Sequence, residues 1–417
     1  MKEIEVVSPE LSKKSSFLSK RLASLDAYRG LIMITLAFGG FGLAKTAGNM
    51  LEQQPDSTLW AFIQNQFSHA QWAGCTYWDL IQPSFMFMVG VSMPYSYSKR
   101  RESGSGYFGM LLHAFSRSVI LVLLGIFLTS NWSDSTSWSF MNVLSQIGLG
   151  YLFVFLLLNR SWVTQALAVV TILVTTWILY ETHPGAGIDA NQANSEIGIS
   201  EEWASVHLEG VNPAWHKNAN FGHSLDRWFL NVANPYLPRK TPFEFNPGGY
   251  QTFNFFPSIA TMLLGLMCGE FLRSGASNRR ILQTLLVAGA LGLLWGYNLD
   301  QFGVSPMIKR LWSPSWVLFS GGCCGLFVFA FYLLFDVLKL RWLAFPLIIV
   351  GMNSIGMYIM GMLLKPWVAK TIKIHTGSSV FELWGPFWEP AVQSTSIGLV
   401  FWLICLYLYR QRIFLRI

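Results

Sequence analysis

Long apolar runs recur along the whole chain and constrain its fold more than any other feature. A helix needs about 20 largely apolar residues to cross ~30 Å of hydrocarbon, and about ten runs approach that requirement. They predict an all-α polytopic membrane protein with about ten transmembrane helices rather than an alternating β-barrel. The predicted spans are residues 31–47, 80–97, 110–129, 143–158, 162–180, 255–272, 281–295, 317–338, 342–364 and 396–409.

Composition and charge agree with this prediction. Of the 417 residues, 52% are hydrophobic and only 12% are charged, which is too apolar for a soluble domain of this length. The net charge of +7 does not indicate nucleic-acid binding, because the basic residues gather at the ends of the predicted spans. Lysine and arginine in short loops mark the cytoplasmic side, so we expect both termini in the cytoplasm.

This orientation defines the expected domain organisation. Residues 1–25 are basic and lack an apolar core, so we expect a cytoplasmic segment rather than a cleavable signal peptide. Residues 26–417 form the predicted transmembrane domain. The loop around His69, the segment 181–250 and the loops 300–313 and 365–389 then share the opposite face. Because the segment 181–250 is too long for an incidental connection, we expect a periplasmic binding loop or cap.

His69 is the strongest candidate for chemistry. It lies among aromatic residues just before the span 80–97, and Asp79 follows at the start of that span. In one continuous helix the two residues would be ~15 Å apart, but a break at Ala73 and Gly74 would let Asp79 orient the imidazole. The alternative is that Asp79 caps its helix and His69 only anchors the loop at the membrane surface.

Polar residues at membrane depth have both structural and functional interpretations. A guanidinium inside a predicted span is costly, so Arg117 indicates a pathway, a ligand or a partner. Asn353 and Ser354 follow a glycine typical of close helix packing, but their amide and hydroxyl groups could line a cavity. Asn254, just before the predicted span 255–272, could also line a cavity with its amide group.

Several other features argue against particular functions. Arg29 can simply pair with Asp26, three residues earlier on the same helix. The five cysteines show no metal-binding spacing and four lie in apolar runs, so we expect neither a disulfide nor a metal site. Without a glycine-rich phosphate loop, ATP hydrolysis and dinucleotide chemistry lack support.

Motifs spread from the first predicted span to the last make the chain resemble the heparan-α-glucosaminide N-acetyltransferase family, which includes bacterial proteins of amino-sugar utilisation. The motifs occur in the family's order. They are LDAYRG at 25–30, HxxWxG at 69–74, DL at 79–80, PxFxFxxG at 83–90, NPGG at 246–249, TFN at 252–254, LWS at 311–313, GMNS at 351–354, LYR at 408–410 and IF at 413–414.

The resemblance implies transfer of acetyl from cytosolic acetyl-CoA to the amine of a glucosamine-type sugar on the periplasmic side of a bacterial inner membrane. It implies that His69 is the catalytic histidine, and that the protein is a homodimer. A base of near-neutral pKa suits an amine acceptor, so His69 is expected to act as general base or as acetyl carrier. The predicted catalytic residues are His69, Asp79 and Asn254; those for acetyl-CoA are Arg29, Lys99, Arg100, Arg117 and Arg273; those for the sugar are Trp72, Trp312, Asn353 and Ser354.

Two features depart from the family pattern. The lysosomal enzymes have a functional asparagine late in the first span, where the register from Arg29 brings Gly40, so Asn49 and Asn65 are candidate substitutes. We also do not expect the large luminal β-rich domain of the animal proteins. A small amino sugar is therefore expected as acceptor rather than polymeric heparan.

Two other functions stay open at this point. A transporter of amino sugar or N-acetylglucosamine fits the helical architecture equally well, although paired half-repeats interrupted by Gly or Pro are not visible. An O-acyltransferase of an envelope glycan would keep the chemistry and replace the amine by a hydroxyl. The residues and the resemblance together favour N-acetyl transfer.

Overall fold

The computed structural model describes residues 22–131, 133–183, 197–233, 236–237 and 241–415, so most of the predicted cytoplasmic segment 1–25 lies outside the described residues. All regular elements in the described ranges are helical. The α-helices are α2 (Ala23–Ala37), α3 (Leu43–Gln53), α4 (Thr58–Gln66), α5 (Ile81–Glu102), α6 (Tyr107–Ser130), α7 (Val143–Leu156), α8 (Trp162–Glu181), α9 (Glu201–His207), α10 (Phe221–Val232), α11 (Phe255–Leu272), α12 (Asn278–Gln301), α13 (Pro314–Tyr332), α14 (Arg341–Gly351), α15 (Ser354–Leu363), α16 (Lys365–Thr376) and α17 (Glu389–Arg410). The shorter elements are 3₁₀ turns η1 (Gly39–Gly42), η2 (Tyr77–Leu80), η5 (Pro213–Trp215), η6 (Thr252–Asn254), η7 (Lys309–Leu311), η9 (Val380–Glu382) and η10 (Pro386–Trp388), and a π-helical turn η8 (Leu333–Val337).

The described part of the chain contains six helices long and apolar enough to cross a membrane, in α6, α8, α11, α12, α13 and α17. Two bent pairs raise the number to eight if each pair is one span: α2 with residues 39–53, bent by 48°, and α14 with α15, bent by 60°. The predicted count of ten is not confirmed. α7 has only 14 residues, about 21 Å of helix, and α5 ends in four charged residues.

Close backbone contacts hold the long helices together. A Cβ added at Gly90 of α5 would lie 1.9 Å from the Met262 carbonyl oxygen of α11, and one at Gly265 would lie 2.0 Å from the Phe87 oxygen. Gly322 of α13 contacts the backbone of α12 in the same way. Small residues let membrane helices approach one another this closely.

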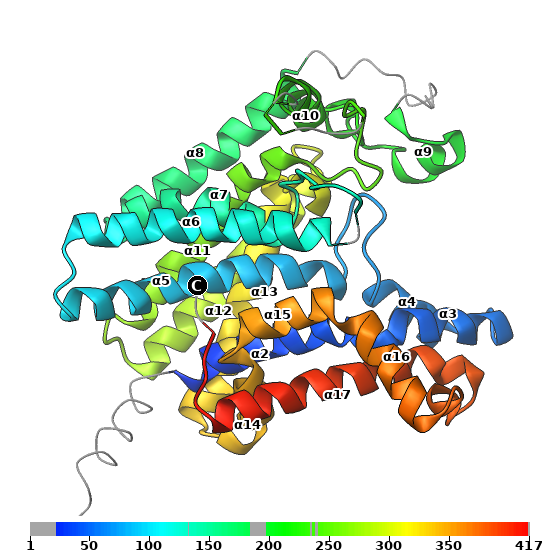
Figure 1. The fold of residues 1–417 in the computed structure, drawn as a ribbon. Helices are drawn as coiled ribbons and strands as arrows, with labels where there is room; N and C mark the ends of the chain where they lie inside the picture. Colours follow the sequence, from blue (N-terminus) through cyan, green and yellow to red (C-terminus); the bar gives the residue numbers. More distant parts are fainter. Residues whose placement is uncertain (1–21, 132, 184–196, 234–235, 238–240, 416–417) are drawn as a thin grey trace, which may run out of the picture.

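The polar loops gather at one end of this bundle, the end where α3, α4, α9 and α16 lie in Figure 1. The Gly74 N–H donates to the Met307 carbonyl at 2.8 Å, which joins the His69 loop to the loop before η7. Trp72 Nε1 donates to the Trp215 carbonyl at 3.2 Å, which joins it to the long segment before α11. The loops predicted to share a face therefore contact one another.

The segment from residue 197 to 250 has its own small core. The rings of Tyr180 and Trp215 stack with centroids 4.5 Å apart, and Trp72 packs into the same apolar cluster. Ile308 and Leu311 are fully buried there. The described part of the segment thus packs against the His69 loop and the turn η7, and its role as a cap stays a prediction.

Basic residues collect at the opposite end of the bundle. Lys99 to Arg101 form the last turn of α5, and Arg101 and Arg160 line a shared hollow of about 270 Å³. Arg273 donates to the Pro94 carbonyl near the end of α5. The assignment of this end to the cytoplasm stays a prediction.

Candidate active site

The loop after α4 folds back on itself, which brings His69 to the start of η2. Gly74 has φ +109°, a conformation that a residue with a side chain rarely adopts. The Thr76 hydroxyl closes the loop from inside, 2.7 Å from the Ser68 carbonyl oxygen. A break was predicted at residues 73–74, and the backbone reverses there.

His69 and Asp79 form the centre of the site. His69 Nδ1 lies 2.6 Å from Asp79 Oδ1. The other oxygen, Oδ2, accepts from the Ala70 N–H at 3.0 Å and from the Thr76 N–H at 3.3 Å, and Thr76 and Asp79 complete a capping box at η2. The two interpretations of Asp79 are therefore both correct: one oxygen orients the imidazole and the other caps the helix.

The buried Asp79 carboxylate is held in its charged form. Its side chain is 1% exposed, against 40% for the His69 ring. Burial raises the pKa of Asp79, but the hydrogen bond to His69 and the charge of Lys309 outweigh burial and lower it to about 2. An ionised carboxylate at Nδ1 selects the tautomer with its proton on Nδ1, which leaves a lone pair on Nε2.

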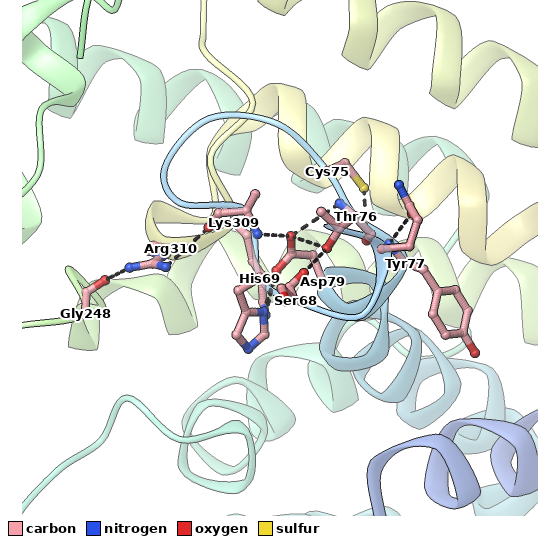
Figure 2. A network of polar contacts seen from close by, with 11 residues as sticks. Ser68, His69, Cys75, Thr76, Tyr77, Asp79, Gly248, Lys309 and Arg310 are labelled. Carbon is pink, nitrogen blue, oxygen red and sulfur yellow. Dashed lines mark hydrogen bonds and ion pairs between the residues drawn. The ribbon is translucent and has the colours of Figure 1, made fainter. Parts of the chain in front are cut away.

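Two basic residues that the sequence analysis did not single out complete the site. Lys309 Nζ lies 3.3 Å from Asp79 Oδ1 and 3.1 Å from His69 Nδ1. Arg310 donates through Nη1 to the Gly248 carbonyl at 2.7 Å and through Nη2 to the Ala70 carbonyl at 3.2 Å, as Figure 2 shows. A sequence signal existed: two consecutive cations stand in a loop on the predicted non-cytoplasmic face, where the positive-inside rule disfavours them.

The turn η7 is fixed on both sides, so Lys309 has a defined position. Asn254 Nδ2 donates to the Arg310 carbonyl at 2.7 Å, and the Ser313 hydroxyl accepts from the Ile308 N–H at 3.0 Å. Trp312 ends the turn with φ +54° and donates from Nε1 to Thr261. Asn254 therefore adjoins the site through Arg310 rather than through His69.

The predicted sugar-binding residues do not come together in one place. Trp72 and Trp312 are buried and use their indole N–H groups within the protein. Asn353 is also buried, and its amide binds the backbone of Ile413 and Leu415. Ser354 is half-buried at the first residue of α15. Sugar binding by these four residues stays a prediction.

The residues predicted to bind acetyl-CoA lie along α2, α5 and α6 and just after α11. Arg29 is 3.7 Å from Asp26, the ion pair considered from the sequence. The guanidinium of Arg117 lies 4.9 Å from the centre of the Tyr151 ring, and that of Arg273 lies 5.4 Å from the Tyr95 ring. Lys99 and Arg100 belong to the basic last turn of α5.

The position expected to hold the family's asparagine is close to the site. Gly40 lies in a left-handed turn with φ +60°, and a Cβ there would be 3.0 Å from the rings of Phe67 and Trp78. The Trp78 ring in turn lies 6.3 Å from the His69 ring, centre to centre. The two candidate substitutes are elsewhere: Asn49 donates to the Phe387 carbonyl, and Asn65 is exposed on α4.

The arrangement suits proton transfer or nucleophilic attack at Nε2. Among the described residues no hydrogen bond involves His69 Nε2, and no group of three His, Cys, Asp or Glu side chains could hold a metal ion. The absence of a metal from the reaction stays a prediction. A buried carboxylate behind a half-exposed imidazole is the geometry of a base or a nucleophile held by a third group.

Comparison with known proteins points to one kind of enzyme. No family model matches the chain. It is 24% identical to the heparan-alpha-glucosaminide N-acetyltransferase of Homo sapiens over 447 aligned residues, which cover 96% of this chain and 61% of the human protein. For the mouse protein of the same name the values are 23% over 456 residues, 98% and 62%.

The matches support a family-level relationship to these acetyltransferases. The chain spans about three fifths of the length of the curated relatives it matches: 61% of the human protein and 62% of the mouse protein. Together with the apolar helices, the relationship supports a multi-pass membrane protein.

Proposed function

We propose, from the relationship to heparan-α-glucosaminide N-acetyltransferases, that the chain is a bacterial inner-membrane enzyme that transfers acetyl from acetyl-CoA to the amine of a small glucosamine-type sugar. The observation that carries the proposal is the His69 imidazole, whose Nδ1 contacts a buried carboxylate 2.6 Å away while its ring is 40% exposed. The cap between residues 197 and 250 would hold the acceptor on the same side.

In the direct route His69 is a general base. Nε2 takes a proton from the neutral sugar amine as the amine nitrogen attacks the thioester carbonyl, and Asp79 stabilises the imidazolium that forms. The tetrahedral intermediate then expels the CoA thiolate, which takes the proton back from Nε2 and leaves as the thiol. The products are the N-acetyl sugar and CoA, and His69 is neutral again.

In the covalent route Nε2 itself attacks the thioester carbonyl. The C–S bond breaks, CoA leaves as the thiol after protonation, and acetyl stays on Nε2. The sugar amine then attacks the acetyl carbon, loses a proton and frees the imidazole. Both routes require the same arrangement, with the Nδ1 proton on the Asp79 side and a lone pair on Nε2.

Binding of acetyl-CoA is proposed at the basic end of the bundle. Arginine favours bidentate contact with phosphates, so Arg29, Arg117 and Arg273 are candidates there, with Lys99 and Arg100 on the last turn of α5. The 22 residues of α5 span about 33 Å between that end and η2. Both routes require the thioester at His69, so the phosphates of the bound donor would lie at the basic end and its acetyl group would reach toward η2. The homodimer stays a prediction.

The test is an assay of purified protein in liposomes with acetyl-CoA and glucosamine. The wild-type protein is expected to release CoA thiol and form N-acetylglucosamine, detected by mass spectrometry, whereas His69→Gln is expected to lose at least about 100-fold in kcat. His375→Gln changes an exposed histidine on α16 and serves as the matched control.

Three outcomes would contradict the proposal. Liposomes that accumulate unmodified sugar and form no acetylated product would indicate a transporter. An acetyl product that hydroxylamine cleaves would be an ester and would indicate an O-acyltransferase. Full activity in His69→Gln would place the chemistry elsewhere.

A further inference from the structure

Lys309 lies where its charge acts on both members of the central pair. Its Nζ atom is 3.1 Å from His69 Nδ1 and 3.3 Å from Asp79 Oδ1, and its side chain is only 6% exposed. Among the described residues Asp79 is the one carboxylate within ion-pair distance of it. Burial lowers the pKa of Lys309, because removing an ammonium from water is costly, and the contact with the Asp79 carboxylate opposes this and favours the charged form.

The hydrogen bonds that these three side chains could make with one another cannot all form at once. Asp79 Oδ1 accepts from His69 Nδ1–H at 2.6 Å, which uses the single proton on that nitrogen. The Lys309 ammonium can then donate to Asp79 but not to Nδ1, so its 3.1 Å approach to Nδ1 puts a positive charge beside the ring without a hydrogen bond. That charge is unfavourable as soon as the imidazole gains a second proton.

The other ionisable groups around the loop do not cancel this effect. The Arg310 guanidinium, which binds the Ala70 carbonyl, adds a second positive charge. Burial raises the pKa of the Cys75 thiol and of the Tyr250 hydroxyl, so both are neutral near pH 7. Asp79 is thus the one negative charge facing two cations.

We propose that Lys309 is a positioning residue: its ammonium keeps Asp79 ionised and opposes protonation of His69, so that Nε2 keeps its lone pair at neutral pH. The inference rests on the proposed function of His69. Asp79 selects the tautomer and stabilises the transient imidazolium, while Lys309 prevents that imidazolium from being the resting state. Together, the charges of Asp79 and Lys309 would keep Nε2 of His69 unprotonated at rest but still able to accept a proton during the reaction.

The first test is the pH dependence of kcat/KM, whose acidic limb reports the essential base of the free enzyme. Removing the cation in Lys309→Met should make His69 more basic, and the acidic limb should move up by about one to three pH units. Activity should return as the pH is raised past the new limb. Lys309→Arg keeps the charge and should leave the limb in place.

Matched controls separate this effect from loss of structure. Lys365→Met removes a half-buried lysine, whose Nζ donates to the Leu36 carbonyl, and should lower stability without moving the limb. A limb that stays in place or moves down in Lys309→Met would overturn the proposal. An equal upward shift of the acidic limb in Lys309→Arg would also overturn the proposal. This second variant keeps the proposal testable if Lys309→Met does not fold.

A second measurement does not depend on turnover. NMR titration of ¹³Cε1-labelled histidine, with the His69 signal assigned from its loss in His69→Gln, follows protonation of the ring directly. The His69 midpoint should rise by the same one to three units in Lys309→Met. If the wild-type protein transfers no acetyl, the proposed function fails, while this titration still decides whether Lys309 controls His69.

Discussion

His69 Nδ1 and Asp79 Oδ1 lie 2.6 Å apart because the loop between the two residues reverses its direction. A straight helix would separate them by ~15 Å. The same carboxylate caps η2 with its second oxygen, so the orientation of the imidazole and the start of the helix depend on one side chain. Substitutions in this pair should therefore affect activity and stability together, and controls must separate the two.

Asp79→Asn should lower kcat about 100- to 10,000-fold, because a neutral amide neither stabilises the imidazolium nor selects the Nδ1–H tautomer. Steady-state kinetics of acetyl transfer would measure the loss. Thr76→Val is the companion variant, since it removes the hydroxyl that lies 3.0 Å from Asp79 Oδ2 and leaves the His69 contact. It should cost about 1 kcal/mol of stability and less than tenfold in kcat. Equal losses of kcat in both variants would contradict the proposed role of Asp79.

Stability should depend on Asp79 at low pH. Its folded-state pKa is lowered to about 2, so its contribution is complete above the unfolded value of about 3.9 and is lost as the pH falls toward 2. The contribution is about 2 kcal/mol at neutral pH, and about half is lost by pH 3. Thermal unfolding in detergent between pH 6 and 3 should show a narrowing Tm difference between wild type and Asp79→Asn. A constant difference would show that the carboxylate is not stabilised in its charged form.

Replacing Arg310 should lower stability and acetyl transfer even when the new residue is lysine. Its guanidinium bridges the carbonyls of Gly248 and Ala70, and a lysine presents a single charged nitrogen that does not match this fork. Arg310→Lys and Arg310→Met should both lose about 1 to 3 kcal/mol of stability and reduce acetyl transfer, since the bridge joins the cap to the His69 loop. Tm and kcat measured side by side would check this. Wild-type values in Arg310→Lys would show that charge alone suffices.

Gly40→Ala should be more harmful than Gly39→Ala. The two residues have nearly the same left-handed φ, +60° and +56°, so the backbone cost of about 1 kcal/mol is shared. A Cβ at Gly40 would also meet Phe67 and Trp78 at 3.0 Å, whereas the nearest atom at Gly39 is 3.7 Å away. Because Trp78 adjoins His69, activity should fall mainly in Gly40→Ala. Equal activity in the two variants would show that Trp78 does not position the imidazole.

Two predicted spans match helices of the structure almost to the residue. The predicted span 162–180 matches α8, Trp162–Glu181, which begins after a Ser161 cap, and 255–272 matches α11. Two predicted spans, 31–47 and 342–364, are bent pairs in the structure. Glycines and an asparagine mark these bends, but the same residues also occur within unbroken membrane helices, so hydropathy alone does not separate the cases.

Three features were predictable from the sequence: the helical, apolar character of the chain, the gathering of polar loops at one end, and the candidate pair His69 and Asp79. These follow from local patterns: hydropathy, charge placement and the spacing within one loop. The contact of Lys309 and Arg310 with that loop was not predictable in this way, because 240 positions separate Lys309 from His69 and the fold brings them together. Their contact depends on how α5, α11 and α13 pack and on the turn that Asn254 holds, and no local pattern encodes a distance between segments so far apart.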